Sequence, residues 1–413
     1  MKLEVKNIGN IADAMLSLDG ITVVGGENGT GKSTLCRALY SVLSGLAVDK
    51  KKIESYRFDR ISRIIQNFLF NFSETESVNK RIQYRKMIYE VIREYRNEKH
   101  VGNLKEYLSD NPQLAGLVDT YGFNEFVEQV ATTLDIPDDK VLVTIISQYL
   151  DEEFNSQIQN LHDDFPDSFI RVENNGKKAE VIIRNNKAEK FKKSLEHFDN
   201  SVLYIDDANI LDKLAGGGLY HGPYRNHESD LQYMLQHTSK SNDPFDVIEL
   251  NEKLKEIDDI LNVVCNGNFV DGQYKESNTD KKIDIRNLSS GLKAFALIKI
   301  LMTNGMLKEH DVLIIDEPET HLHPQWQLKF SQILVLLHKQ MNLTILLNSH
   351  SPYFIQAVSV YANKYGIDDD KCRFYLAENE EGNSHFTDVT QNKEPLYAKL
   401  ARPFQILENE RWS

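Results

Sequence analysis

A glycine-rich turn near the N-terminus constrains the fold of this chain most. The stretch VVGGENGTGKST contains the pattern G-x-x-x-x-G-K-S from Gly26 to Ser33. The preceding residues, ITVV, are typical of a buried strand, and residues 31–46 have helical spacing. A strand, a glycine-rich turn and a helix in this order form the setting of a phosphate-binding loop. The N-terminal segment therefore predicts an α/β sheet with an anion site at the end of one strand.

The residue types in this loop suit a nucleoside triphosphate. Glycines let backbone N–H groups turn toward phosphate oxygens without Cβ clashes, and the following helix adds its positive N-terminal end. Lys32 supplies a point charge for the β- and γ-phosphates, and Ser33 supplies a hydroxyl to Mg²⁺. A chance glycine-rich turn is the alternative, but the strand–helix context favours a site for ATP and Mg²⁺. The predicted nucleotide-binding residues here are Gly26, Glu27, Asn28, Gly29, Thr30, Gly31, Lys32, Ser33 and Thr34.

A second polar cluster follows an apolar stretch far along the chain. Residues 312–315, VLII, end in Asp316 and Glu317. Ligands of open α/β sheets bind at the carboxyl ends of the strands, so Asp316 is predicted to coordinate Mg²⁺ together with Ser33. Glu317 is predicted to be the general base, or the group that positions water. Acidic residues also end strands without any function, and the phosphate-binding loop upstream favours the functional interpretation.

A third apolar stretch, LTILL, ends in Asn348, Ser349 and His350. A lone histidine at a strand end is more often structural than catalytic. Here the strand follows the carboxylate strand, so His350 is expected at the same sheet edge, where it can hydrogen-bond a γ-phosphate. The predicted catalytic residues are therefore Lys32, Glu317 and His350.

In the stretch NLSSGLKAFALI, the segment LSSGL ends about two dozen residues before Asp316. Taken alone, it indicates a serine N-cap on a buried helix. In this order with the three other motifs, Leu288-Ser289-Ser290-Gly291-Leu292 resembles the LSGGQ signature of ABC-type ATPases. That resemblance implies that Ser289, Ser290 and Gly291 contact the γ-phosphate held by the phosphate-binding loop of a second subunit. ATP would then join two heads head to tail.

Two departures from the common ABC pattern indicate a particular branch of these ATPases. Ser290 and Leu292 replace the second glycine and the glutamine of the signature, and the loop after Glu317 reads PETHLHP without the aspartate often found there. Both changes resemble the RecF- and OLD-like branch. The stretches DEPETHLHPQWQLKF and LLNSHSPYF are similar to PtuA-type ATPases of bacterial anti-phage systems (Septu and retron-associated operons). Over 1–45 and 282–365 the resemblance is specific, and it implies an oligomeric ATPase that controls a separate effector, a nuclease, in antiviral defence.

The pattern of apolar residues predicts the domain organisation. We predict an α/β P-loop ABC-type ATPase head with a mixed or parallel sheet and an inserted α-helical subdomain. The head comprises 1–49 and 166–365, the helical insertion 50–165, and a C-terminal hairpin and helix 366–413. Several stretches within 50–165 place apolar side chains on one helical face. Strand and helix patterns alternate over 282–362, beginning with KKIDI. A glycine-rich loop is expected at 215–226.

Three features remain open to more than one interpretation. The Q-loop, which links the two lobes of ABC ATPases, has no clear match in the sequence, and Gln66 and 205–209 are the two candidates for it. His321 and His323 are too isolated for a metal pair and are interpreted as loop-shaping residues near the dimer seam. Basic residues of the insertion alternate with glutamates and indicate a solvated helix face. If the protein binds DNA, this insertion is where we expect the contact. The basic residues are Lys80, Arg81, Arg85, Lys86, Arg93 and Arg96.

Composition narrows the class of protein. Hydrophobic residues make up 41% and charged residues 27% of the chain, as in ordinary globular proteins. The net charge of −14 argues against a protein that coats nucleic acid non-specifically. Three scattered cysteines fit a reducing cytosol. Without a signal peptide or an apolar run of roughly 18 residues, a cytoplasmic location without membrane contact is expected.

Two other functions compete with the effector-control hypothesis. A RecF-like DNA repair or recombination ATPase would clamp DNA directly. The ATP subunit of a membrane transporter is disfavoured by the lack of a clear Q-loop, by the helical insertion and by the HLHP loop. No HNH, TOPRIM or deaminase signature is visible, so a nuclease site within this chain is not expected.

Overall fold

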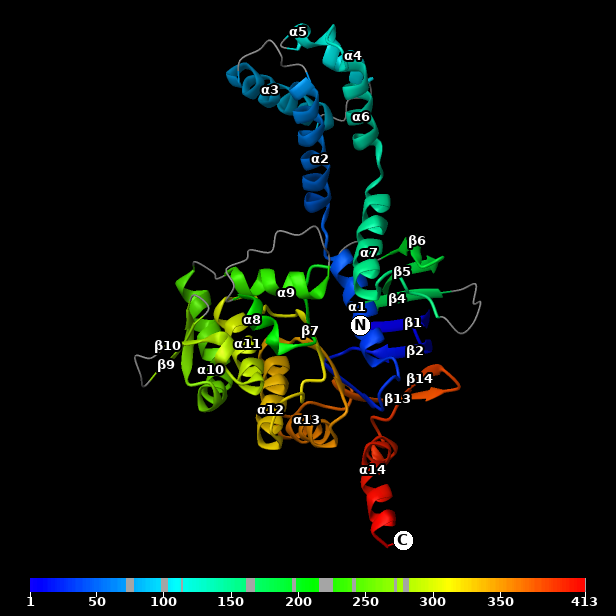
Figure 1. The fold of residues 1–413 in the computed structure, drawn as a ribbon, viewed down its shortest axis with the longest axis vertical. Coiled ribbons are helices and arrows are strands. Elements are labelled where there is room, and N and C mark those ends of the chain that lie inside the picture. The colour runs from blue at the N-terminus through cyan, green and yellow to red at the C-terminus, as the bar shows by residue number, and fades with distance from the viewer. Residues whose placement is uncertain are drawn as a thin grey trace. The chain divides into compact units, whose positions relative to one another are not determined.

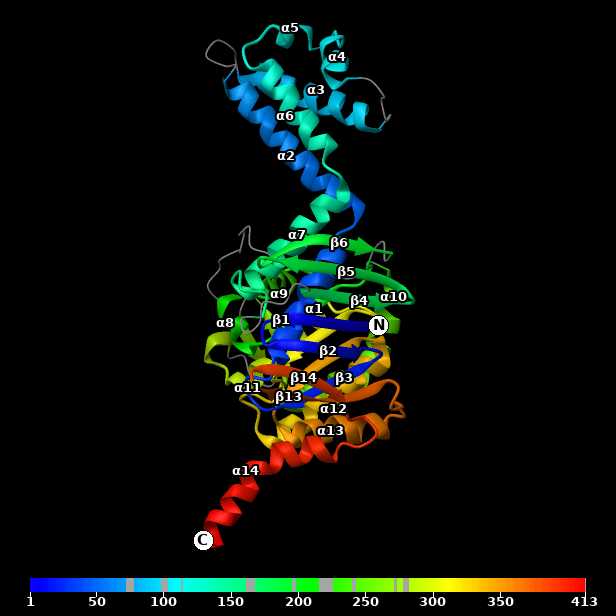
Figure 2. The same cartoon turned by 90° about the vertical axis from the view of Figure 1, so that its right-hand side faces the viewer.

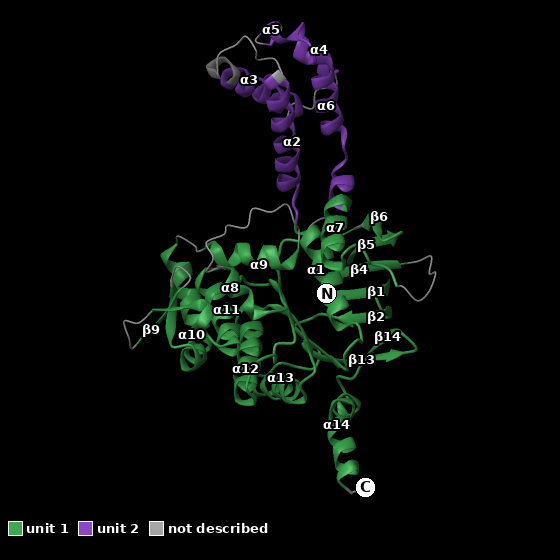
Figure 3. Cartoon of the chain, in the orientation of Figure 1, with its two compact units in different colours: residues 1–47, 143–413 green, residues 48–142 purple. Residues whose placement is uncertain are grey.

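The computed structural model describes residues 1–71, 78–97, 103–112, 114–160, 168–194, 198–214, 226–239, 243–270, 273–277 and 282–412. The chain forms two compact units (Figure 3). Met1–Ala47 and Val143–Ser413 make up the first, called the head below. Val48–Leu142 make up the second, called the helical unit.

One mixed sheet organises the head, as predicted (Figures 1 and 2). Its strand order is β6-β5-β4-β1-β2-β14-β13-β3-β12-β11-β7. Strands β13, β3, β12, β11 and β7 run parallel, whereas β2, β1, β4, β5 and β6 form an antiparallel meander. The strands are β1 Lys2–Ile8, β2 Ile11–Ser17, β3 Ile21–Gly26, β4 Ser168–Asn174, β5 Lys177–Arg184, β6 Lys187–Lys193, β7 Val202–Ile205, β11 Val312–Asp316, β12 Thr344–Ser349, β13 Cys372–Glu380 and β14 Asn383–Asp388.

The register of the parallel strands aligns their polar ends. Val24 lies opposite Asn348, Asn348 lies opposite Asp316, and Ile315 lies opposite Ile205. The strands are almost entirely buried up to these positions, and β11 and β12 then deliver polar residues at the edge where β3 leads into the glycine-rich loop. This edge positions the candidate site.

Helices pack around the parallel strands. Phe295 of α11 is fully buried and lies edge-on against Trp326 and Phe330 of α12, which itself packs on α13 and α10. The helices of the head are α1 Lys32–Leu46, α8 Leu211–Leu214, α9 His227–Gln236, α10 Pro244–Val264, α11 Ser290–Thr303, α12 Pro324–Met341, α13 Pro352–Lys364 and α14 Glu394–Trp412, with single 3₁₀ turns η1 Ala208–Ile210 and η2 Ile285–Asn287. Helix α7, Asp138–Phe154, begins in the helical unit and enters the head at Val143. In the described part of the chain, each helix is too short or too polar to span a membrane.

The helical unit has a core of its own. Its helices are α2 Lys50–Asn71, α3 Val78–Asn97, α4 Leu104–Ser109, α5 Ala115–Val118 and α6 Phe123–Asp135. The predicted apolar face of α2 is buried at Ile61, Ile65 and Phe68, and the Phe68 ring stacks on Phe126. Buried Arg57 donates to the backbone carbonyls of Thr133 and Ile136, which fastens α2 to the end of α6.

Two domain boundaries differ from the prediction. The insertion is shorter than 50–165, because α7 beyond Val143 packs on α1: the Tyr40 and Tyr149 rings lie 5.7 Å apart, edge to face. The segment 366–413 is not separate, because β13 pairs with β3 and β14 pairs with β2 inside the main sheet. Sequence periodicity does not reveal either contact, since both join residues far apart in the chain.

Other differences concern short strands. KKIDI, predicted as part of the alternating core, contributes β10, Lys282–Asp284, to a separate antiparallel sheet with β8, Gly267–Val270, and β9, Gln273–Glu276. Strand β6 was not predicted because it is rich in lysine, a residue that protects exposed sheet edges. Residues 215–225 of the predicted glycine-rich loop lie outside the described residues.

The contact between α1 and α7 generates a testable prediction. A Cβ added at Gly45 would lie 2.3 Å from Cγ1 of Ile146, so Gly45→Ala is expected to destabilise the head by about 1–3 kcal/mol. Urea unfolding measures this loss. Gly116→Ala in the helical unit is the control, because its new Cβ would lie 3.6 Å from the Tyr84 hydroxyl and should be tolerated. A Gly45→Ala protein as stable as the unmodified one would contradict the close packing of these helices.

Candidate functional site

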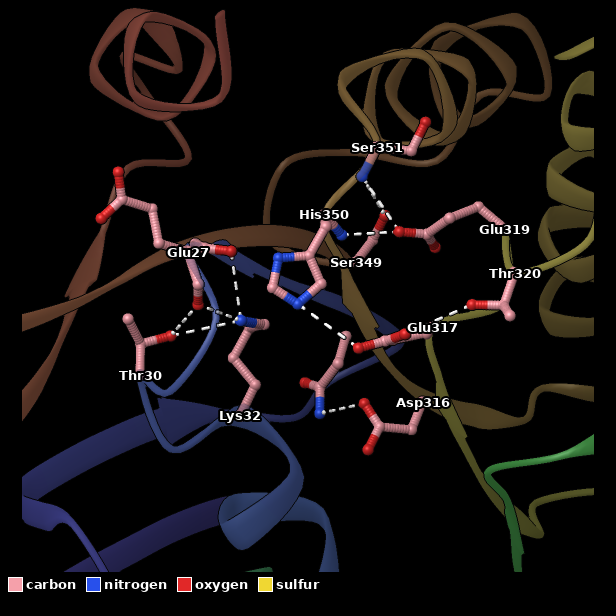
Figure 4. A network of polar contacts seen from close by, with 12 residues as sticks. Glu27, Thr30, Lys32, Asp316, Glu317, Glu319, Thr320, Ser349, His350 and Ser351 are labelled. Atoms are coloured by element: carbon pink, nitrogen blue, oxygen red, sulfur yellow. Dashed lines mark hydrogen bonds and ion pairs between the residues drawn. The ribbon is translucent and has the colours of Figure 1, made fainter. Parts of the chain in front are cut away.

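The phosphate-binding loop connects β3 to α1 and is closed around the amine of Lys32. This amine donates to the backbone oxygens of Gly26 at 3.1 Å and Glu27 at 2.7 Å, and to Oγ1 of Thr30 at 3.2 Å (Figure 4). Burial lowers the pKa of Lys32 to about 8, although the charges of Asp316, Glu317 and Glu319 oppose the shift. A bound phosphate would add negative charge and favour the protonated amine.

The glycines of the loop are required by close approach as well as by conformation. Gly31 has φ +79°, and a Cβ there would lie 2.8 Å from Oδ1 of Asn10 and 2.9 Å from Cγ1 of Ile11. A Cβ at Gly26 would lie 2.3 Å from the carbonyl oxygen of Ala377 on β13. The C-terminal hairpin therefore shapes the loop from one side, a contact that the sequence did not predict.

Asp316 stands at the end of β11 in a polar frame. The Asn348 amide donates to its Oδ1 at 3.1 Å, and the Tyr204 hydroxyl donates to its Oδ2 at 3.3 Å. The Asp316 carboxylate and the Ser33 hydroxyl at the start of α1 together offer few protein oxygens to a metal ion. Mg²⁺ is typically held by one or two carboxylates, waters and substrate phosphates, so this donor set fits Mg²⁺ bound with a nucleotide. In the described ranges no group of three or more His, Cys, Asp or Glu forms a protein-only metal site.

Glu317 and His350 face each other above this carboxylate. Oε1 of Glu317 lies 3.5 Å from Nε2 of His350, and the Thr320 hydroxyl donates to Oε2 at 3.3 Å (Figure 4). Glu317 adopts φ +49°, and its backbone N–H donates to the Asn348 carbonyl at 3.0 Å. Burial and the charge of Lys32 lower the pKa of His350, so its imidazole is neutral at pH 7. The three predicted catalytic residues thus lie together at one sheet edge.

Glu319 is a functional candidate that the sequence did not single out. It accepts hydrogen bonds from the backbone N–H groups of His350 at 2.6 Å and Ser351 at 3.0 Å. Burial raises the pKa of this carboxyl group. Glu319 therefore fixes the turn that presents His350. Its only sequence signal is its position two residues after Glu317, in the stretch DEPET.

The LSSGL motif opens α11, with exposed Ser289 as its N-cap. The Ser289 hydroxyl accepts from the backbone N–H of Leu292 at 3.3 Å. A Cβ at Gly291 would lie 2.9 Å from the His321 carbonyl oxygen and 3.2 Å from the Trp326 ring. Ser289, Ser290 and Gly291 line a surface concavity that they share with His321, His323 and Trp326. His321 has φ +65° and His323 caps α12, which agrees with a loop-shaping function for both histidines.

One of the two Q-loop candidates lies at the site. Asp206, Asp207 and Asn209 line a small cavity together with Asp316 and Glu317, and Ser290 of the LSSGL motif also borders it. The strand register explains this placement, since Asp206 directly follows the residue opposite Ile315. Gln66, the other candidate, lies on α2 of the helical unit.

Comparisons with known proteins agree with the predicted nucleotide chemistry. Residues 1–355 match the family described as AAA ATPase domain. Septu protein PtuA from Bacillus thuringiensis is 34% identical over 107 residues, which is 23% of this chain and 26% of that protein. The matched segment thus spans about a quarter of the relative, and its similarity confirms the predicted resemblance to PtuA-type ATPases.

Solved structures of SMC heads resemble the chain more weakly. The SMC head domain from Thermotoga maritima gives a TM-score of 0.41 at 10% identity, covering 94% of this chain and 98% of that one. An SmcHead bound to the C-winged helix domain of ScpA gives 0.46 at 9% identity, covering 95% and 98%. Both scores lie below 0.5, so the fold assignment rests on the sheet topology described above.

Lys32→Ala is expected to lose nucleotide binding. Removing the buried cation eliminates charge-assisted hydrogen bonds of about 2–3 kcal/mol, which raises the Kd for ATP by roughly 30- to 150-fold. Titration with a fluorescent ATP analogue measures the change. Lys253→Ala, which removes an exposed lysine paired with Glu309 on the surface, is the matched control. Unchanged affinity in Lys32→Ala would contradict the phosphate-binding assignment.

Glu317→Gln is expected to bind ATP but to hydrolyse it slowly. The amide keeps the shape of the side chain yet cannot accept a proton, so kcat should fall by about 10²- to 10⁴-fold with little change in ATP affinity. Single-turnover hydrolysis compared with equilibrium binding separates the two effects. Glu309→Gln serves as a control on the surface. Normal turnover in Glu317→Gln would exclude this residue as the base.

Proposed function

We propose that the ATP cycle of this chain, which belongs to the AAA ATPase domain family, joins and separates two heads. The chain is a P-loop ATPase that binds ATP. The proposal concerns what this activity does. Two heads pair head to tail around ATP and Mg²⁺, and hydrolysis releases them.

The position of the LSSGL motif carries this proposal. Exposed Ser289 and the N-terminal N–H groups of α11 form an anion-binding arrangement. The residues that share its concavity, His321, His323 and Trp326, come from the loop before α12 and from α12 itself. Residues of the phosphate-binding loop are not among those that line this concavity in the described part of the chain. A γ-phosphate presented by a second head would accept hydrogen bonds from the Ser289 hydroxyl and from backbone N–H groups at the start of α11.

Two helices connect the nucleotide site to the helical unit through the chain itself. Helix α1 starts at Lys32 and ends at Leu46, next to the boundary at Ala47. Helix α7 crosses the other boundary at Val143, and its Ile146 contacts α1 at Gly45. A change at the phosphate-binding loop therefore acts on both chain segments that lead into the helical unit.

We further propose that the ATP cycle controls a separate effector, a nuclease, in anti-phage defence. This step rests on the similarity to Septu protein PtuA. The second half of α14 is a candidate docking segment, because Phe404, Ile406 and Leu407 are exposed and residues 402–411 are exposed throughout. Leu400 and Leu396, one and two turns before Phe404, face the hydrophobic core of the head. An effector with an apolar groove would cover the unpartnered continuation of this face.

A pull-down from the native host tests the effector hypothesis. Tagged Glu317→Gln protein is captured in the presence of ATP, and stoichiometric partners are identified by mass spectrometry. A co-purifying nuclease that is lost in the Phe404→Ser, Leu407→Ser variant would support the proposal and the docking segment. Capture of DNA or repair factors without a nuclease would contradict it.

The charge of helices α2 and α3 favours a second candidate, a DNA-clamping ATPase. Helices α2 and α3 carry 12 Lys or Arg and four Asp or Glu in a chain whose net charge is −14. Exposed Arg85 and Lys86 border a groove with the Phe58 and Tyr89 rings. This function predicts ATP-dependent duplex binding with a steep salt dependence, weakened in Arg85→Glu, Lys86→Glu. Fluorescence anisotropy distinguishes it from effector control.

Ser289→Arg tests the pairing of heads. The bulky cation should leave the protein's own phosphate-binding loop intact, so that ATP affinity stays within about twofold, while blocking the phosphate site of the partner and lowering kcat at least ~100-fold. Steady-state hydrolysis and light scattering with ATP report the two effects. Lys275→Arg on β9 is a surface control. Normal turnover by Ser289→Arg would contradict a site shared between heads.

A further inference from the structure

His227, at the start of α9, is held between the buried carboxylate of Glu153 and the more exposed carboxylate of Asp206. Its Nδ1 lies 2.9 Å from Oε1 of Glu153 on α7, and its Nε2 lies 2.9 Å from Oδ2 of Asp206. The backbone N–H of His227 also donates to Glu153, at 2.7 Å. Both ring nitrogens and the main chain are thus committed to one bridge.

The Asp206 end of this bridge belongs to the nucleotide site. Asp206 lines the same small cavity as Asp316 and Glu317. A second connection runs through an aromatic ring, because the Tyr204 ring lies 4.3 Å from the His227 ring while its hydroxyl donates to Asp316. His227 therefore supports both side chains that stand beside the predicted metal ligand.

The Glu153 end belongs to the helix that comes from the helical unit. The Glu153 side chain is almost fully buried, and α7 is held nearby by a second polar contact. The hydroxyls of Tyr149 on α7 and Tyr40 on α1 both donate to Oδ2 of Asp230, one turn after His227. The start of α9 is thus packed between α7, α1 and β7.

Electrostatics keep the bridge charged. Burial would lower the pKa of His227, but Asp206 and Glu153 outweigh it and raise this pKa to about 9. Burial would raise the pKa of Asp206, but His227 and the charge of Arg37 hold it below its usual range. The largely buried His227 cation lies between the buried carboxylate of Glu153 and the more exposed carboxylate of Asp206, so removing Glu153 would leave it without its buried partner.

We propose that His227 is a positioning residue that ties α7 to the Asp206, Tyr204 and Asp316 wall of the nucleotide site. Any shift of α7 moves Glu153, and the bridge transmits it to the residues that orient the metal ligand. The helical unit then has a direct route to the rate of hydrolysis, besides the route through α1. This inference rests on the assignment of Asp316 to Mg²⁺ and does not depend on the pairing of heads or on an effector.

The dependence of ATP hydrolysis on Mg²⁺ tests the proposal. His227→Gln is expected to raise the Mg²⁺ concentration for half-maximal turnover about 10-fold, because residues that orient metal ligands typically contribute that much to metal affinity. Binding of ATP in EDTA, which relies on Lys32, should stay within about twofold. Glu153→Gln should give the same effect, and the double variant should be no worse than either single variant.

Two controls separate positioning from stability. Tyr149→Phe removes a neighbouring hydroxyl on the same helix without touching the bridge, and it should leave the Mg²⁺ dependence unchanged. Thermal unfolding of each variant verifies that the head is folded. A normal Mg²⁺ dependence in folded His227→Gln would overturn the proposal, as would a silent Glu153→Gln. If His227→Gln lost both ATP binding in EDTA and thermal stability, the residue would have a purely structural function, and the proposal would also be overturned. Ser289→Arg reports on head pairing separately, so failure of either hypothesis is recognisable.

Discussion

The parallel pairing of β3, β12, β11 and β7 is the constraint on which the rest of this structure depends. These strands are buried on both faces, so their hydrogen-bond register is fixed by apolar packing rather than by the site. With that register, Asp206, Asp316 and Asn348 emerge side by side, next to the loop that follows β3. A slip of one residue in any strand would turn its polar end away from Lys32. The chemistry of the edge therefore depends on the apolar core of the sheet.

The sequence was sufficient to predict the parts of the site that are local in the chain. The glycine-rich loop, Asp316 with Glu317, and His350 each end an apolar stretch, and this pattern alone places them on one edge. Glu319 and His227 were missed because their partners are defined only after folding: Glu319 contacts backbone groups of His350 and Ser351, and His227 contacts α7 and the residue after β7. Strand β13 was predicted as a hairpin strand, but its insertion beside β3 depends on pairing over more than 300 residues.

The chain passes between the head and the helical unit at two points, just after helix α1 and within helix α7. Helix α1 carries Lys32 at its first turn, and α7 carries the Glu153 that holds His227. These two helices pack on each other inside the head and continue to the two chain boundaries of the helical unit.

The central claim is that each ATP is completed by two chains, and mixing two inactive variants tests it most directly. Lys32→Ala retains its LSSGL motif, and Ser289→Arg retains its phosphate-binding loop, so a mixed pair contains one intact composite site. Equimolar mixing should restore hydrolysis to about a quarter of the unmodified rate, because half of randomly formed pairs are mixed and each has one working site of two. If the mixture stays as inactive as its components while both variants still associate, the site is not shared between heads.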